Sequence, residues 1–196
     1  MQKKALYLLA LATIFSISIN AQSYEEQFAK CSEPLKALGT NVDSLYFVRL
    51  HERDSCLSGS IAPDFEATSI DGQKIQLSKL KGQVVVLNFW FTRCQPCIQE
   101  MPALNKLVEH YSDRQVRFIS FALEDTATLL KFFQQHPFKF TAIANSENIR
   151  QDKFRLFSAW PYTIIIDRFG RISKMWFGNP GKKVFDYYQE AIDKLL

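Results

Sequence analysis

Beyond residue 60 the chain alternates between two hydrophobic patterns. The run at 83–91, QVVVLNFWF, is almost continuously apolar and rich in β-branched and aromatic residues. Such a run is typical of a strand that is buried on both faces of a sheet. The next segment, 98–111, places Met101, Leu104, Leu107 and Val108 at the spacing of one helix face. The two patterns together predict a strand followed by a helix.

The same alternation continues to the C-terminus. Residues 65–78 predict a short hairpin that turns at Asp71-Gly72. Further strands are expected at 116–123 and 138–145, and helices at 127–136 and 148–158. The chain should then close with an antiparallel hairpin at 162–178 and an amphipathic helix at 182–196. Strands that alternate with helices predict an α/β fold, with a sheet covered on both faces.

The first 60 residues have a different character. Lys3 and Lys4 precede an uncharged, apolar stretch that ends near the small residue Ala21, which is the pattern of a secretory signal. The stretch is short for a membrane span, although a retained N-terminal anchor is the alternative. We therefore predict a signal at 1–21, a polar and partly helical extension at 22–60, and a compact domain at 61–196.

Composition and charge narrow the class of protein. The 196 residues are 47% apolar and 22% charged, as expected for one ordinary globular domain. Removal of residues 1–21 leaves 22 basic and 20 acidic residues, which gives no argument for a nucleic-acid partner. An exported protein can keep disulfides, and all four cysteines follow the predicted signal. The expected location is therefore outside the cytosol, in the periplasm.

The candidate chemistry lies in the CxxC pair Cys94 and Cys97. A structural zinc site needs four ligands, yet the chain has no second CxxC and its three histidines are scattered. A purely structural disulfide over so short a loop would stabilise little. At a helix N-terminus, by contrast, a thiolate at Cys94 is favoured, and Cys97 lies close enough to resolve a mixed disulfide. The pattern therefore favours redox exchange, with no metal.

The motif VVVLNFWFTRCQPCIQEMP and the later AWPYTIIID resemble the TlpA/ResA group of thiol-disulfide oxidoreductases, which belongs to the thioredoxin superfamily and is related to AhpC/TSA proteins. The resemblance covers roughly residues 61–196. It implies a thioredoxin fold, with a central mixed sheet flanked by helices, an N-terminal hairpin and here a small helical extension. It also implies a cis proline at Pro161, although a proline that merely begins an edge strand is the alternative.

The resemblance suggests further site residues. Glu100 would assist proton transfer at the cysteines, unless it only complements the helix dipole. Trp160, before the cis proline, would offer its backbone to a substrate strand. Arg93 replaces the usual tryptophan; it would either face the substrate and favour the thiolate, or point to solvent. Asn88 stands where thioredoxin has a buried aspartate and cannot accept a proton.

Cys31 and Cys56 enclose about 25 residues, and a disulfide between them would stabilise the extension by roughly 3.5 kcal/mol. The alternative is that Cys56 is a free thiol that exchanges with the active pair.

The expected function is exchange with protein disulfides, as a reductant supplied by a membrane thiol-transfer protein and without an organic cofactor. Apocytochrome c is one possible substrate. Two alternatives are a peroxiredoxin-like peroxide reductase and a copper-binding module that would use His136.

Overall fold

A five-stranded mixed sheet forms the centre of the computed structural model, which describes residues 23–37 and 44–196. The signal expected at 1–21 lies outside these residues. The strand order is β5–β4–β3–β6–β7, in which β3, β4 and β5 are parallel to one another and β6 and β7 are each antiparallel to the preceding neighbour. The strands are β3 (Val84–Trp90), β4 (Val116–Ala122), β5 (Thr141–Ile143), β6 (Tyr162–Ile166) and β7 (Ile172–Phe177). This is the mixed α/β architecture expected of a thioredoxin fold.

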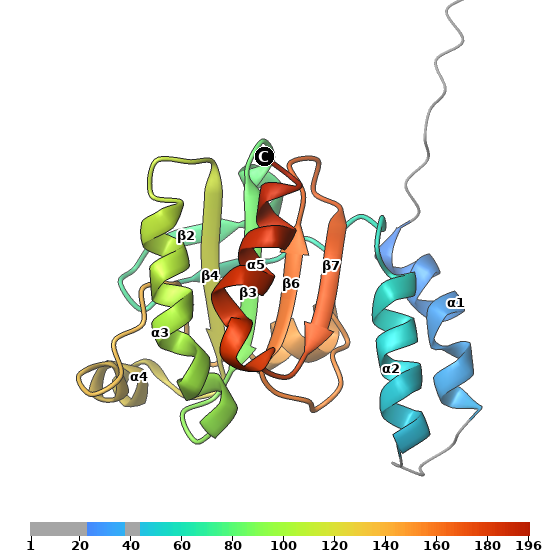
Figure 1. The fold of residues 1–196 in the computed structure, drawn as a ribbon, viewed down its shortest axis with the longest axis horizontal. Helices are drawn as coiled ribbons and strands as arrows, with labels where there is room; N and C mark the ends of the chain where they lie inside the picture. The colour runs from blue at the N-terminus through green and yellow to red at the C-terminus, as the bar shows by residue number, and fades with distance from the viewer. Residues whose placement is uncertain (1–22, 38–43) are drawn as a thin grey trace, which may run out of the picture.

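Helices α3 (Gln95–His110) and α5 (Val184–Asp193) cover one face of the sheet (Figure 1). Every residue of β3 is buried, and successive side chains point to opposite faces. Val84 and Val86 pack with Leu104 of α3 and Tyr188 of α5. The continuous apolar run of β3 is therefore explained by burial on both sides.

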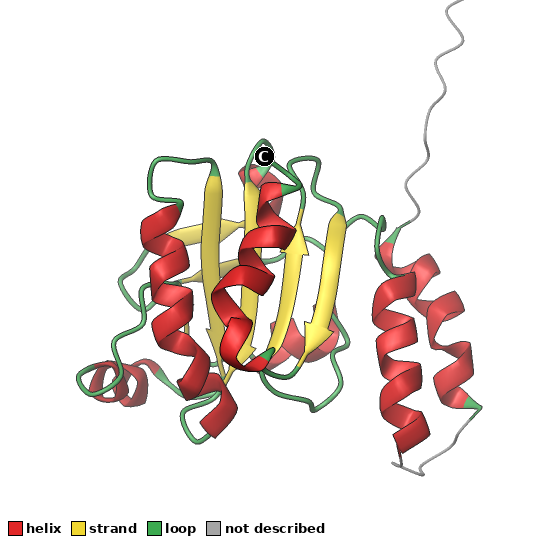
Figure 2. Ribbon diagram, in the orientation of Figure 1, coloured by secondary structure: helices red, strands yellow, loops and turns green. Residues whose placement is uncertain are grey.

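The opposite face is covered by the hairpin of β1 (Glu66–Thr68) and β2 (Lys74–Gln76) and by irregular chain (Figure 2). Leu87 and Phe89 of β3 pack there with Phe65 and Phe154. The shorter helices are α4 (Thr126–Phe133), η1 (Leu77–Leu80), η2 (Ile149–Lys153) and η3 (Gly181–Lys183).

Two helices of the N-terminal extension, α1 (Tyr24–Lys36) and α2 (Ser44–Cys56), lie side by side next to the β7 edge of the sheet (Figure 1). A disulfide joins Cys31 of α1 to Cys56 of α2. The Tyr24 hydroxyl donates a hydrogen bond of 2.5 Å to the carbonyl oxygen of Phe154. Tyr24, Cys31 and Leu57 are buried in the same apolar cluster as the sheet residues. The extension therefore shares the core of the sheet.

The helix expected at 148–158 forms only over its first part. Only one π-helical turn forms, at Ile149–Lys153, and Arg155 has a positive φ of 46° that ends it. The Arg150 guanidinium donates hydrogen bonds to the carbonyl oxygens of Leu156 and Phe157, which draws the chain back after this turn. The strand expected at 138–145 is likewise shorter: only Thr141–Ile143 pairs with β4, and Phe138 and Phe140 stack on each other before β5.

Candidate active site around the Cys94–Cys97 disulfide

The cysteine pair lies where β3 gives way to α3. Cys94 is the N-cap of α3 and is joined to Cys97 by a disulfide, with a Cα–Cα distance of 5.2 Å. The Cys97 backbone N–H points at the Cys94 sulfur, 3.3 Å away. Pro96 occupies the first helical turn, where its missing N–H costs no hydrogen bond. Both cysteines are buried, with Cys94 4% and Cys97 1% exposed.

A side chain from the neighbouring strand holds the segment that leads into Cys94. Glu124, just after β4, accepts hydrogen bonds from both the backbone N–H and the hydroxyl of Thr92, at 2.9 and 2.6 Å. Parallel pairing of β3 with β4 brings these two residues to the same edge of the sheet. The segment that leads into Cys94 is therefore held by hydrogen bonds between residues that follow β3 and β4.

Glu100 lies one helical turn beyond Cys97 and is only 1% exposed. Its Oε1 accepts a hydrogen bond of 2.9 Å from the Asn88 side-chain amide, which also approaches the Thr163 hydroxyl at 3.3 Å. The Thr163 hydroxyl in turn bonds the Tyr188 hydroxyl at 2.6 Å. A buried polar network thus runs from the disulfide's helix through β3 and β6 to α5.

Burial raises the pKa of the Glu100 carboxyl from 4.5 to about 8, and the hydrogen bond from Asn88 offsets only part of this shift. Within the described residues the second carboxylate oxygen, Oε2, has no hydrogen-bond partner. An ionised carboxylate here is therefore poorly compensated. A carboxyl that titrates near neutral pH is suited to proton transfer.

The Trp160–Pro161 peptide bond is cis. The Trp160 ring packs against the cluster that contains both active-site cysteines, where it meets Phe91 edge-on at 5.4 Å. The loop after β7 connects the cis proline to the cysteine segment. The Gly178 N–H donates to the Pro161 carbonyl, and the Asn179 side chain donates to the Pro96 carbonyl, both at 2.8 Å.

Within the described part of the chain, no hydrogen bond engages the backbone of Trp160, so its N–H and C=O are free to pair with another chain. Arg93, next to Cys94, is exposed.

Several polar residues contribute to the site without having been predicted from the sequence. Thr163 and Tyr188 complete the Glu100 network. Arg150 lies over the Trp160 ring, 5.1 Å from its centroid, and holds the loop that leads to it. Glu124 holds Thr92. The available signal was a polar side chain within an otherwise apolar segment, as at Thr163 in YTIIID, but the partner of such a residue comes from a distant element.

A buried ion pair supports the other side of the cis proline. Arg53 and Asp54 of α2 are 5% and 1% exposed, and the Arg53 guanidinium donates to Asp54 at 2.6 Å and to the Tyr162 hydroxyl at 2.8 Å. The Tyr162 hydroxyl also donates to Asp54. Burial raises the pKa of the Asp54 carboxyl, although Arg53 and Tyr162 offset part of the effect. Tyr162 directly follows Pro161. The pair therefore ties α2 to the segment that contains Trp160 and Pro161, here called the cis-proline loop.

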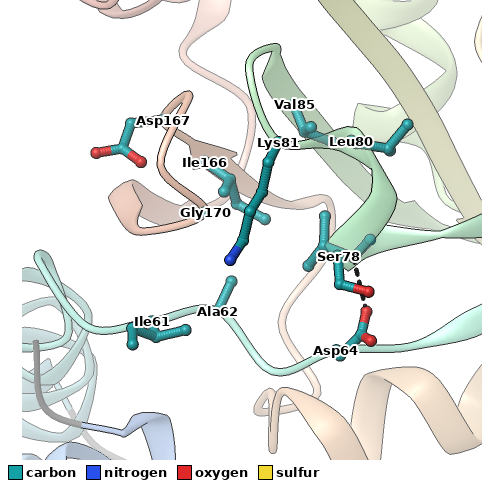
Figure 3. A pocket seen from close by; sticks show the side chains of 11 residues that line it. Ile61, Ala62, Asp64, Ser78, Leu80, Lys81, Val85, Ile166, Asp167 and Gly170 are labelled. Carbon is teal, nitrogen blue, oxygen red and sulfur yellow. Dashed lines mark hydrogen bonds between the residues drawn. The ribbon is translucent and has the colours of Figure 1, made fainter.

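A pocket lies at the other end of the sheet (Figure 3). Val85 and Ile166, which are paired across β3 and β6 away from the cysteines, line its floor, and Lys81 and Asp167 stand near its mouth. No predicted site residue lines it.

Among residues 23–37 and 44–196, no cluster of three or more histidine, cysteine or acidic side chains could hold a metal ion. No helix in the same described ranges is long and apolar enough to span a bilayer.

Comparisons with known proteins agree with this geometry. The model of the AhpC/TSA family matches residues 58–175. Thiol-disulfide oxidoreductase ResA of Bacillus cereus (strain ZK / E33L) is 31% identical over 150 residues, which cover 76% of this chain and 86% of that protein. Thioredoxin-like protein YneN of Bacillus subtilis (strain 168) is 36% identical over 129 residues, which cover 64% of this chain and 74% of that protein.

Solved structures support the fold. A thiol:disulfide interchange protein of the thioredoxin family from Chlorobium tepidum TLS superimposes with a TM-score of 0.59 at 23% identity, over 69% of this chain and 94% of that chain. StoA from Bacillus subtilis gives a TM-score of 0.57 at 19% identity, over 67% of this chain and 97% of that chain. The chain therefore belongs to the AhpC/TSA family and is a ResA-like thiol-disulfide oxidoreductase of the thioredoxin superfamily.

Proposed function

We propose that the chain is an exported reductase of protein disulfides that acts through the Cys94–Cys97 pair. The observation that carries this proposal is the burial of both sulfurs at the N-terminus of α3, beside a buried Glu100. Burial in apolar surroundings disfavours a thiolate, and a pair whose reduced form is weakly stabilised is a reductant. Arg93 is exposed and so supplies no buried positive charge that would oppose this effect.

The residues have distinct roles in the exchange. The Cys94 thiol loses its proton to solvent, and the thiolate attacks one sulfur of a substrate disulfide. The substrate S–S bond breaks, and the other substrate sulfur leaves as a thiolate that takes up a proton from solvent. Cys97 then loses its proton to Glu100 and attacks the Cys94 sulfur. The second substrate sulfur leaves as a thiolate and takes up the proton held by Glu100. The substrate gains two electrons and two protons, and the enzyme is left as the Cys94–Cys97 disulfide. The carrier is this disulfide, so no organic cofactor is required.

The substrate binds at the cis-proline loop. An extended substrate segment pairs with the backbone of Trp160, which Pro161 leaves facing the disulfide, and Arg93 borders the same approach. The unengaged Trp160 backbone supports this role.

Export is supported by the two disulfides among the described residues, since disulfides persist mainly outside the cytosol, and by the signal-like pattern at 1–21. A periplasmic reductase must itself be re-reduced, and a membrane thiol-transfer protein is the proposed donor. Apocytochrome c is a proposed substrate, because its haem-binding cysteines must be reduced before haem attachment.

The reduction potential of the Cys94–Cys97 pair tests the direction of electron flow. The protein is equilibrated in thiol-disulfide buffers, and mass mapping after alkylation shows which cysteines titrate. A potential near or below about −250 mV supports a reductant, whereas a value near about −120 mV, as in a strong periplasmic oxidant, would contradict it. The Cys31→Ser/Cys56→Ser variant is the control that isolates the active pair. Consumption of peroxide that depends on Cys94 would instead favour the peroxidase alternative.

A further inference from the structure

Exposed apolar side chains are concentrated at the start of α2. Leu45, Phe47 and Val48 are 44%, 40% and 51% exposed, although the inner side of the same helix already buries Leu50. A helix that flanks a core normally presents polar residues outward. Contiguous exposed apolar side chains often mark an interaction site.

This part of α2 is continuous with the active site. The Phe47 ring lies 5.9 Å from the Phe177 ring, and His51 stacks on Phe177 at 4.3 Å. Phe177 is paired with Tyr162, the residue after the cis proline, and the next residue, Gly178, donates its N–H to Pro161. The start of α2, the end of β7 and the N-terminus of α3 all lie at the lower end of the molecule in Figure 1.

The apolar side chains are also held in place from behind. The Tyr46 ring packs on Phe157 at 4.9 Å, in the loop that leads to Trp160. Two turns later, Arg53 and Asp54 bind the Tyr162 hydroxyl. The surface is therefore fixed relative to the cis-proline loop, which lowers the ordering cost of binding.

We propose that Leu45, Phe47, Val48, His51 and Phe177, here called the α2 surface, bind apolar side chains of an extended, non-native polypeptide whose cysteine reacts with Cys94. The proposal deepens the proposed function, on which it rests, because it names the substrate class. A substrate sulfur that reaches Cys94 places its flanking residues on the surrounding surface. A substrate segment that pairs with the free Trp160 backbone can extend from there to the α2 surface.

The size and apolar character of the α2 surface favour this occupant. Its five side chains are few beside the 20 to 30 residues that each partner contributes to a typical stable interface between folded proteins. Four of the five side chains are apolar, so they match apolar side chains that a folded substrate would bury. A chain that still awaits folding or haem attachment exposes such side chains.

Two peptides test the proposal. Each carries one cysteine as a mixed disulfide with glutathione, and they differ only in the flanking residues, which are leucine and phenylalanine in one and serine in the other. The reduced enzyme is oxidised by each peptide, and kcat/KM is measured from the thiols released. The ratio of the apolar to the serine peptide is the readout, because a change in the redox chemistry itself cancels from it.

The ratio is expected to exceed one in the wild-type protein and to fall about tenfold in Val48→Asp, since contact with one apolar side chain contributes roughly this factor. The fall should come from KM. Phe169→Asp is the matched control: Phe169 is 76% exposed and lies in the β6–β7 turn, at the opposite end of the sheet, so the ratio should not change.

An unchanged ratio in both Val48→Asp and Leu45→Asp would overturn the α2 surface, with the redox function intact. So would a dimer in solution that Val48→Asp dissociates, because the occupant would then be a second copy of the chain. Failure of the wild-type protein to be oxidised by either peptide or by glutathione disulfide would instead overturn the proposed function, and the α2 surface with it.

Discussion

Glu100 illustrates how a single residue is tuned by its surroundings. Its carboxyl is buried one helical turn after Cys97, accepts a hydrogen bond from Asn88, and has a pKa of about 8. Above this pH the folded protein must hold a buried negative charge, whereas the unfolded chain ionises freely above 4.5. The residue proposed to assist proton transfer therefore also makes the stability of the folded protein depend on pH.

Replacement of Glu100 by Gln should make the oxidised protein progressively more stable than the wild type as pH rises from 5 to 8. In this window the folded state binds the proton that the unfolded state has lost, so the wild-type unfolding free energy falls by about 1.4 kcal/mol per pH unit relative to the variant. Urea unfolding at each pH measures the difference. Glutamine keeps the acceptor for Asn88 and has no charge to bury.

Glu109→Gln is the control from the same helix. Its carboxylate is exposed and paired with Lys139, which lowers its pKa, so any contribution to stability is lost only as pH falls towards the acid range. A pH-independent difference between Glu100→Gln and the wild type from pH 5 to 8 would contradict the buried carboxyl.

At the scale of elements, α2 is bound to the sheet by a buried charge pair and to α1 by a disulfide. The Arg53–Asp54 pair meets Tyr162 at the start of β6, and the Cys31–Cys56 disulfide ties α2 to α1. The Arg53–Asp54 pair is buried, and both of its side chains are hydrogen-bonded to Tyr162. The disulfide stabilises the fold by restricting the unfolded chain.

Arg53→Met is expected to destabilise the protein by about 3 to 5 kcal/mol, because it leaves the Asp54 charge buried without its partner. Adding Asp54→Leu should recover part of this loss, since the double variant buries neither charge. The unfolding free energies of the two single variants and the double variant form a cycle. A double variant as unstable as the sum of the single variants would show that the pair is not coupled.

Cys31→Ser/Cys56→Ser should lose roughly 3.5 kcal/mol of stability if the disulfide acts mainly by closing a loop of 25 residues in the unfolded chain. The potential of the Cys94–Cys97 pair should remain at its wild-type value. Denaturant unfolding and redox titration of the same sample separate the two effects. A shifted potential would indicate that the two cysteine pairs exchange.

At the scale of the whole molecule, the extension and the sheet share one apolar core. Tyr24, Cys31 and Leu57 belong to the same buried cluster as Phe89 of β3 and Phe154. A unit that shares its core with a neighbour unfolds together with it.

Urea unfolding of the oxidised protein should therefore show one transition. Far-UV circular dichroism reports all helices, including α1 and α2, whereas tryptophan fluorescence reports the sheet domain, where Trp90, Trp160 and Trp176 all lie. The two midpoints should coincide. An earlier transition seen only by circular dichroism would mean that the extension unfolds independently.

Much of the fold was predictable because its signals are local. The continuous run of β3 and the helical spacing of α3 were sufficient to place the cysteines at a strand-to-helix junction. The helix at 148–158 was predicted too long, because the Arg150 side chain donates hydrogen bonds to the carbonyl oxygens of Leu156 and Phe157, which leave the helix. Hydrophobic periodicity does not show whether a polar side chain will bind backbone carbonyls in this way.

The candidate site divides in the same way. Cys94, Cys97, Glu100 and Pro161 carry their chemistry in a recognisable spacing, so sequence alone identified a thiol-disulfide oxidoreductase. Only the tertiary structure brought Thr163 and Tyr188 to the Glu100 network and Arg53 to the cis-proline loop, from positions 25 and 109 residues apart along the chain for the pairs Thr163–Tyr188 and Arg53–Tyr162. The reason is physical: a motif depends on neighbours in the chain, whereas burial, and with it the pKa of Glu100, depends on which distant elements close around the residue.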